Sequence, residues 1–419
     1  FIVFISSVLV ASVFLFTAFY YGVFAGIVAT LSLSLYPLFF AEEHFNIKDP
    51  VETAFYGLAL MSFYWAAVRN SRKILFVSSL LAGLALSTKF NIVFATITVF
   101  LWIVVYQLSR VKSMAIAFLV YPCIAFIMLI TPWPYLWYDP IGKQTKVVGN
   151  YRLIGGSAYQ TTTLLPFWGL NTYALQWVFF ATPLVTLFLF LVGVWWTLRF
   201  GMREKTKTGL FVFLWFLVPI VRVSLPWTGI YGGLRQIMEF IPALAILSGI
   251  GAKYLVGSRW LLRFVILFAF VPITLKIISI HPNQNVYINP LIGGLGGAKE
   301  RNFPDWGVSL GSVYQQGMDW LNQNTKREGN VTLVKGLLSN VPRIKIRSDI
   351  NFADRYWSGE QKLGEYLMEV TDYYWTRDIP LEKRTYLETL LPVYEVTVDS
   401  VPILTIWKND KAHTKTLSR

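Results

Sequence analysis

The first 41 residues, FIVFISSVLVASVFLFTAFYYGVFAGIVATLSLSLYPLFFA (1–41), contain no charged side chain. A membrane-spanning helix needs about 20 predominantly apolar residues, so this stretch is long enough for two spans. The Tyr20-Tyr21-Gly22 segment is the predicted turn between them. A secretory signal peptide would instead begin with basic residues and contain a shorter apolar core. The stretch therefore predicts that the chain enters a membrane from its first residues.

Apolar segments of similar length recur through the first two thirds of the chain. The ten predicted spans are 1–20, 22–40, 52–68, 74–88, 90–108, 113–131, 174–198, 208–226, 236–252 and 264–280. Polar connections separate them, and the pattern becomes mixed after residue 280. We therefore expect an α-helical polytopic membrane domain of about ten transmembrane helices over 1–280, followed by a separate domain over 281–419.

The composition places the chain outside the soluble and disordered classes. Of 419 residues, 55% are hydrophobic and only 14% are charged, whereas about 25% of residues are charged in a soluble domain. Residues 1–280 contain 20 basic and 7 acidic side chains, and residues 281–419 contain 17 and 16. Because the basic excess lies in the apolar part, nucleic acid is not an expected partner. The single cysteine, Cys123, excludes an intrachain disulfide.

Basic residues in short loops predict the orientation, because cytoplasmic loops are enriched in Lys and Arg. Four connections contain twelve of them: Arg69, Arg72, Lys73, Arg110, Lys112, Arg199, Arg203, Lys205, Lys207, Lys253, Arg259 and Arg263. We expect these loops to be cytoplasmic, which places 281–419 outside the cytoplasm. In that segment we predict helices at 313–324 and 382–391 and strands at 330–334, 393–398 and 403–407. These elements indicate a small extracytoplasmic α/β domain.

Four of the seven acidic residues of 1–280 lie in and beside one predicted outer loop, at Glu42, Glu43, Asp49 and Glu52. Carboxylates there could act as a general base, an acceptor clamp or ligands of a divalent cation, the only cofactor that this residue set suggests. In the plainer interpretation the loop is solvated, and Asp49 caps the helix that Pro50 begins. The candidate catalytic residues are Asp49 and Glu43, and the candidate substrate ligands of the loop are His44, Asn46 and Lys48. The sequence identifies no metal-ligand set.

Basic residues also occur on the predicted outer side, where topology rules leave few. Charges at the ends of apolar segments are expensive and mark either functional sites or paired groups. Arg235 and Glu239 are spaced to pair on one helix face, and Lys276 could extend its ammonium to the membrane surface. The candidate ligands of an anionic substrate are Lys89, Arg152, Arg222, Arg235 and Lys276.

The long loop 132–173 combines aromatic residues with Lys143, Lys146 and Arg152. Its aromatic residues are Trp133, Tyr135, Trp137, Tyr138, Tyr151, Tyr159, Phe167, Trp168 and Tyr173. Aromatic residues beside cations are typical of a membrane–water interface, and such rings also suit stacking on sugars. The composition leaves both interpretations open.

Short strings in four regions of the chain fit one known family, both in their order and in the side of the membrane on which each is predicted to lie. They are EHFNIKDP (43–50), GLALSTKFN (83–91), GLRQI (233–237) with PALA (242–245), and HPNQNVYIN (281–289) with DWG (305–307) and DWLN (319–322). They resemble an outer loop, a helix ending in Thr-Lys, an Arg-led late helix and the start of the outer domain in GT-C glycosyltransferases related to the protein O-mannosyltransferases. The likeness covers nearly the whole chain.

The resemblance implies an enzyme of the plasma (inner) membrane of a prokaryote that takes a sugar from polyprenyl phosphate. It implies that Asp49 is the acid of the second outer loop and that Lys89 and Arg235 lie near the lipid phosphate. The usual catalytic carboxylate of the family lies in the first outer loop, which we expect to precede Phe1. Gln236 stands where close relatives have His or an aromatic residue.

The sequence therefore predicts a membrane glycosyltransferase of hexosyl or mannosyl type that acts at the outer face. Its expected partners are a polyprenyl-phosphate-linked sugar donor, membrane lipids and an acceptor (protein, lipid or glycan) that the sequence does not identify. A transporter or lipid flippase without transferase activity is the first alternative, and an assembly subunit is the second. The outer position of the charges favours the enzyme, because transporters place their binding sites at helix breaks near the midplane.

Overall fold

The computed structural model describes residues 1–106, 115–157, 169–225, 228, 230, 232–307, 311–354, 365–371 and 381–415. The chain divides into two compact units, Phe1–Ile278 and Ser279–Arg419.

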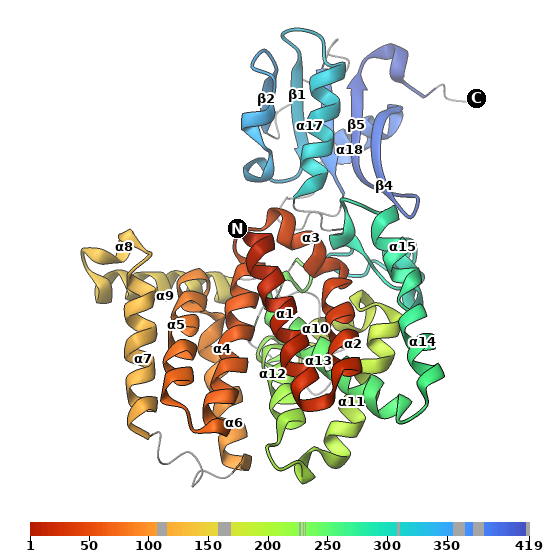
Figure 1. The fold of residues 1–419 in the computed structure, drawn as a ribbon. Helices are drawn as coiled ribbons and strands as arrows, with labels where there is room; N and C mark the ends of the chain where they lie inside the picture. Colours follow the sequence, from red (N-terminus) through yellow and green to blue (C-terminus); the bar gives the residue numbers. More distant parts are fainter. Residues whose placement is uncertain are drawn as a thin grey trace. The chain divides into compact units, whose positions relative to one another are not determined.

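The N-terminal unit is helical (Figure 1). Its elements are α1 (Ile2–Tyr21), α2 (Val23–Ser34), α3 (Pro37–Phe45), α4 (Asp49–Arg69), α5 (Arg72–Thr88), η1 (Phe90–Phe94), α6 (Ala95–Tyr106), α7 (Ala115–Ile130), α8 (Pro134–Trp137), α9 (Pro140–Ser157), α10 (Tyr173–Ala181), α11 (Leu184–Phe200), η4 (Gly201–Arg203), α12 (Thr208–Ser224), η5 (Arg235–Phe240), α13 (Ile241–Val256), α14 (Trp260–Phe268) and α15 (Val271–Ser279). The prefix η marks 3-10 helices. The predicted turn after Tyr21 is present, because Gly22 adopts a positive φ of 97° that glycine tolerates.

The prediction of ten spans is not confirmed. Among the described residues, five helical stretches are long and apolar enough to cross a membrane, namely Ile2–Tyr21, Asp49–Arg69, Leu184–Arg203, Arg235–Val256 and Trp260–Ser279. A sixth results if α2 and α3, which are bent by 59°, form one broken span. The predicted segment 174–198 is two helices, because the chain breaks at Thr182-Pro183. A multi-pass membrane protein remains the conclusion.

The centre of this unit is formed by α13, which packs against α2 and α11. Its residues from Ile241 to Ala252 are all buried. The close approach of α11 and α13 requires glycine, because a Cβ at Gly193 would lie 1.9 Å from the Leu247 carbonyl oxygen and one at Gly251 would lie 1.9 Å from the Leu189 carbonyl oxygen. A second packing series joins α1 to α4, α4 to α5, and α5 to α7, and these helices run side by side in Figure 1.

The C-terminal unit is an α/β domain with a five-stranded sheet in the order β2-β1-β3-β5-β4. Its main elements are α16 (Gly294–Glu300), α17 (Ser312–Asn324), β1 (Asn330–Lys335), β2 (Asn351–Asp354), β3 (Glu365–Val370), α18 (Leu381–Thr389), β4 (Pro392–Val398) and β5 (Val401–Asn409). Strand β1 pairs in parallel with β2 and β3, and β5 pairs antiparallel with β3 and β4. The predicted helices and three predicted strands are confirmed, and β2 and β3 were missed.

Candidate active site

The turn between α3 and α4 is organised by the Asn46 side chain. Its Oδ1 accepts hydrogen bonds from the backbone N–H groups of Lys48, at 3.0 Å, and Asp49, at 3.1 Å. Its Nδ2 donates to Glu42 Oε2 at 2.6 Å and to Asp49 Oδ2 at 2.8 Å. Asn46 thus makes the capping contacts that the sequence suggested for Asp49, which is the first residue of α4 and makes no cap bond. This arrangement points two carboxylates to one side of the turn.

Asp49 and Lys89 form a buried ion pair. Lys89, between α5 and η1, donates from Nζ to Asp49 Oδ1 at 2.9 Å and to the Gln236 carbonyl oxygen at 2.8 Å. The two side chains are 10% and 5% exposed, respectively. Burial acts to lower the pKa of Lys89, but the nearby carboxylates of Asp49, Glu239 and Glu52 outweigh it and raise that pKa above its ordinary value. Lys89 is therefore a fixed cation in this site.

A second ion pair lies beside the first. Arg222, near the end of α12, donates from Nη2 to Glu239 Oε1 at 3.3 Å and from Nη1 to Asn91 Oδ1 at 2.9 Å. Asn91 Nδ2 donates in turn to the Gln236 carbonyl oxygen at 2.8 Å, the same oxygen that accepts from Lys89. The Arg222 guanidinium also stands 4.6 Å from the centre of the Phe94 ring. These contacts fix the start of η5, where Arg235 lies.

Glu52 lies one helical turn after Asp49, on the same face of α4. It is 1% exposed, and its Oε1 has no hydrogen-bond partner among the described residues. The charges of Glu239, Lys89, Asp49 and Arg222 all act on it. Glu239 Oε2 likewise lacks a partner in the described part of the chain. We call Glu42, Asn46, Asp49, Glu52, Lys89, Asn91, Arg222, Arg235 and Glu239 the polar cluster.

Arg235 is partly buried at the first position of η5. The expected pairing of Arg235 with Glu239 on one helix face is replaced by the Arg222–Glu239 pair, because 235–240 is a 3-10 segment with a non-helical Ile237. The pKa of Lys48 is lowered by partial desolvation and by the positive charges of Lys89 and Arg235, against the opposing charge of Asp49. Cations therefore gather around the α3–α4 turn.

Other predicted site residues lie apart from these contacts. His44 is exposed, and its Nδ1 lies 2.6 Å from the Phe40 carbonyl oxygen within α3. Glu43 is partly buried, whereas its neighbour Glu42 is the acid that bonds to Asn46. Lys276 is partly buried on α15, an element that supplies none of the contacts given above. Arg152 belongs to α9, and its side chain lies outside the described residues.

Sequence reasoning did not select Glu42, Glu52, Asn91 or Glu239. Glu42 and Glu52 belong to the acidic group noted beforehand, and Asn91 is in the string shared with the resembling family. One sequence feature could have pointed to these acids: acidic residues are scarce in an apolar unit, and each buried charge there needs a partner. No three His, Cys, Asp or Glu side chains in the described ranges are placed to hold a metal ion.

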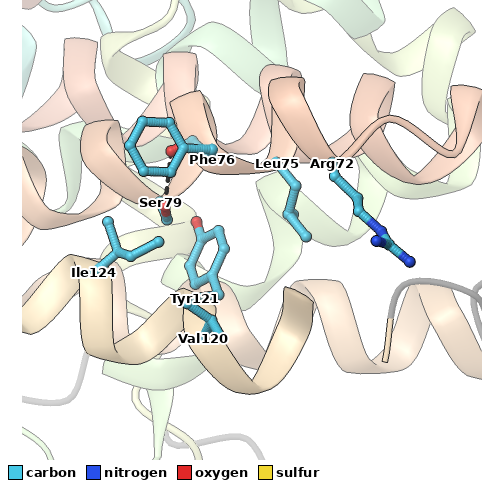
Figure 2. A pocket seen from close by; sticks show the side chains of 7 residues that line it. All are labelled: Arg72, Leu75, Phe76, Ser79, Val120, Tyr121 and Ile124. Carbon is cyan, nitrogen blue, oxygen red and sulfur yellow. Dashed lines mark hydrogen bonds between the residues drawn. The ribbon is translucent and has the colours of Figure 1, made fainter. Parts of the chain in front are cut away.

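A hollow between α5 and α7 lies toward the other end of α5 from Lys89. Its lining residues, drawn in Figure 2, are Arg72, Leu75, Phe76, Ser79, Val120, Tyr121 and Ile124. Ser79 Oγ is occupied by a hydrogen bond to the Phe76 carbonyl oxygen at 2.7 Å. The lining is mostly apolar and contains one cation, so its chemistry differs from that of the polar cluster.

Comparisons with known proteins identify the fold. No protein-family model matches the sequence, and no curated protein sequence matches it. The chain is similar to ArnT from Cupriavidus metallidurans bound to undecaprenyl phosphate, with 13% sequence identity, a TM-score of 0.54 and coverage of 99% of this chain and 84% of that one. It is also similar to the apo state, with 14% identity, a TM-score of 0.53 and the same coverage. The chain thus has the fold of ArnT, and the resemblance inferred from the sequence is confirmed at the level of the fold.

Proposed function

We propose that the chain is a glycosyltransferase whose sugar donor is linked to polyprenyl phosphate. The observation that carries this proposal is a buried cluster with three cations, Lys89, Arg222 and Arg235, within a fold that ArnT shares. One ArnT structure is bound to undecaprenyl phosphate. In this chain, the fixed cations of the apolar unit could bind the phosphate of such a lipid.

Lys89 and Arg235 suit the phosphate for different reasons. Lys89 is held by Asp49 and by the Gln236 carbonyl oxygen, so its ammonium needs little reorganisation when an anion arrives. Arg235 offers a planar fork of donors that can hold two phosphate oxygens at once. Arg222 is occupied by Glu239 and Asn91 and supports the cluster.

The proposed reaction transfers one sugar to an acceptor hydroxyl. The hydroxyl oxygen attacks the anomeric carbon, the bond from that carbon to the phosphate oxygen breaks, and the hydroxyl proton passes to a carboxylate. Polyprenyl phosphate leaves with one more negative charge than it had as a diester. The cluster cations stabilise that developing charge, which is where electrostatic catalysis is strongest. The hexosyl or mannosyl donor, the acceptor and the outer-face location belong to this proposal.

For Asp49 we propose a positioning role. Its Oδ1 accepts from Lys89 and its Oδ2 accepts from Asn46, so both oxygens are occupied and Asp49 is a weak proton acceptor. Asp49 would therefore orient Lys89 toward the phosphate. Glu42 replaces Glu43 as the α3 carboxylate of the cluster, because Glu42 is buried and bonded to Asn46.

The full chain in proteoliposomes tests the proposal. Undecaprenyl-phosphate-linked hexoses and pentoses, labelled in the sugar, are supplied with lipid and peptide acceptors. We expect labelled product together with an equal amount of released undecaprenyl phosphate. A transporter or flippase would move the intact donor across the bilayer and release no undecaprenyl phosphate, and that result would reject the transferase.

A further inference from the structure

The charges of the polar cluster do not all find partners. Asp49 is paired with Lys89, and Glu239 is paired with Arg222. Glu52 is almost fully buried and within reach of the charges of both pairs. In the described part of the chain, no ion pair includes it. The Tyr56 hydroxyl, one turn further along α4, is also buried without a hydrogen-bond partner among the described residues. The charged groups around Glu52 are thus already paired with each other, Lys89 with Asp49 and Arg222 with Glu239.

An isolated carboxylate is costly to bury, and it avoids this cost by taking up a proton. The groups that face Glu52 come from four elements. Asp49 and Tyr56 belong to α4, Lys89 precedes η1, Arg222 belongs to α12 and Glu239 belongs to η5. Two of the ionisable neighbours are carboxylates that repel a charge on Glu52, and the two cations are already neutralised. A proton on Glu52 would remove this cost.

Charge balance links this proton to the anion that the site would bind. The cluster contains the carboxylates of Glu42, Asp49, Glu52 and Glu239 against the cations Lys89, Arg222 and Arg235, with Lys48 at its edge. If all these groups were ionised, the charges would cancel and an incoming phosphate would meet no net attraction. A proton on Glu52 leaves one positive charge for the phosphate.

We propose that Glu52 is the proton-holding residue of the phosphate site: it stays protonated while a lipid phosphate is bound and weakens phosphate binding when it ionises. The inference rests on the proposed function, because it assumes that the cluster binds the phosphate. Glu52 is a positioning residue in this role, since it acts through the local charge and touches no reacting atom. Binding of the lipid phosphate and retention of one proton are then thermodynamically coupled.

The experiment measures the affinity of the purified full chain in nanodiscs for undecaprenyl phosphate between about pH 7 and pH 9, above the second phosphate ionisation near pH 6. The wild-type chain should bind more weakly as pH rises, with the dissociation constant increasing by up to about tenfold per pH unit once Glu52 ionises. Glu52→Gln keeps the size and the neutral form, so its affinity should match wild type at the lower pH and fall less steeply than wild type as pH rises. The dependence that remains belongs to Glu42, because burial raises the pKa of that carboxyl to about 7. Asp139→Asn is the matched control, because Asp139 is an exposed acid at the α8–α9 turn.

Equal pH dependence in wild type and Glu52→Gln would overturn the proposal, as would a flat wild-type curve. A second variant guards against a folding defect in the first. Glu239→Gln removes the neighbouring negative charge and lets Arg222 pair with Glu52, so Glu52 should ionise more easily. Phosphate binding should therefore begin to weaken at a lower pH than in wild type. An unchanged onset in a folded Glu239→Gln protein would also contradict the proposal.

Infrared spectroscopy separates this proposal from the proposed function. A protonated Glu52 gives a neutral carboxylic-acid C=O band at a pH above the pKa of Glu42, which burial raises to about 7, and Glu52→Gln removes that band without any ligand present. If undecaprenyl phosphate fails to bind at every pH, the phosphate site is wrong, while the band still decides whether Glu52 holds a proton. Absence of the band in the wild-type chain would overturn the inference about Glu52 on its own.

Discussion

The Asp49–Lys89 pair allows the contribution of the cluster to stability to be separated from its contribution to donor binding. Lys89→Met removes the ammonium and leaves Asp49 buried opposite an apolar chain. Loss of one partner of a buried pair typically costs about 3–5 kcal/mol, and the side chains here are only 10% and 5% exposed. We expect the free energy of unfolding of Lys89→Met to fall by an amount in that range.

Lys89→Met/Asp49→Asn tests the origin of that loss. With both charges removed, the remaining defect is the Gln236 carbonyl oxygen, which loses one of its two side-chain donors, and one such loss costs about 1–3 kcal/mol. The double variant should therefore be more stable than Lys89→Met alone. Donor binding should nevertheless stay lost in both, because both lack the ammonium.

The assay is reversible unfolding of the purified full chain in mixed micelles, combined with binding of undecaprenyl phosphate. Lys89→Met and Asp49→Asn are measured alone and together, so that their coupling energy is obtained. Additive losses would show that the two groups do not interact and would refute the reasoning. Full phosphate binding by a folded Lys89→Met protein would remove Lys89 from the phosphate site.

Three further predictions concern single positions. Asn91→Leu removes the amide that joins Arg222 to the Gln236 carbonyl oxygen, so stability should fall by about 1–3 kcal/mol and the KM for donor should rise; an unchanged KM beside the same stability loss would leave Asn91 a purely structural role. Arg235→Lys keeps the charge but loses the two-donor fork, so the transfer rate should fall, whereas Lys276→Arg should be tolerated. A lower transfer rate in Lys276→Arg than in Arg235→Lys would exclude a role for the two-donor fork of Arg235. A cysteine introduced by Ser400→Cys should react with a membrane-impermeant thiol reagent on intact cells, and reaction only after permeabilisation would place the C-terminal unit in the cytoplasm.

Much of the fold could be predicted from residue patterns. The apolar runs identified the membrane unit, the strand patterns between turn residues identified β1, β4 and β5, and an amphipathic pattern identified α17. Strand β2 is only four residues long, and β3 is buried along its whole length, so neither shows the alternation that predicts a strand. The predicted count of ten spans is not confirmed. Pro183 divides one predicted span, and Pro37 begins a new helix after a bend, and neither break was predicted.

The candidate site was predictable in part. Asp49 and Lys89 were selected from their types and positions, and the structure joins them across 40 residues of sequence. The contacts around this pair could not be predicted. The Gln236 carbonyl oxygen is a backbone atom, and Asn91, which shares that oxygen with Lys89, is a neutral amide with no charge to single it out. For a related reason, the sequence could not show that Glu42, and not Glu43, bonds to Asn46. Adjacent helical residues point in different directions, and only tertiary packing shows which one is buried.

Binding of a lipid phosphate by the polar cluster, at α4, η1 and η5, can be tested directly. The most direct measurement uses undecaprenyl phosphate with a photoreactive group next to the phosphate, cross-linked to the full chain in nanodiscs and mapped by peptide mass spectrometry. We predict labelling at η5 and at the segment around Lys89, and we predict that unlabelled undecaprenyl phosphate competes with it. Labelling confined to helix α14, whose apolar residues Trp260, Leu261 and Phe264 are exposed, or labelling that does not respond to competitor, would show that the phosphate does not bind at the polar cluster.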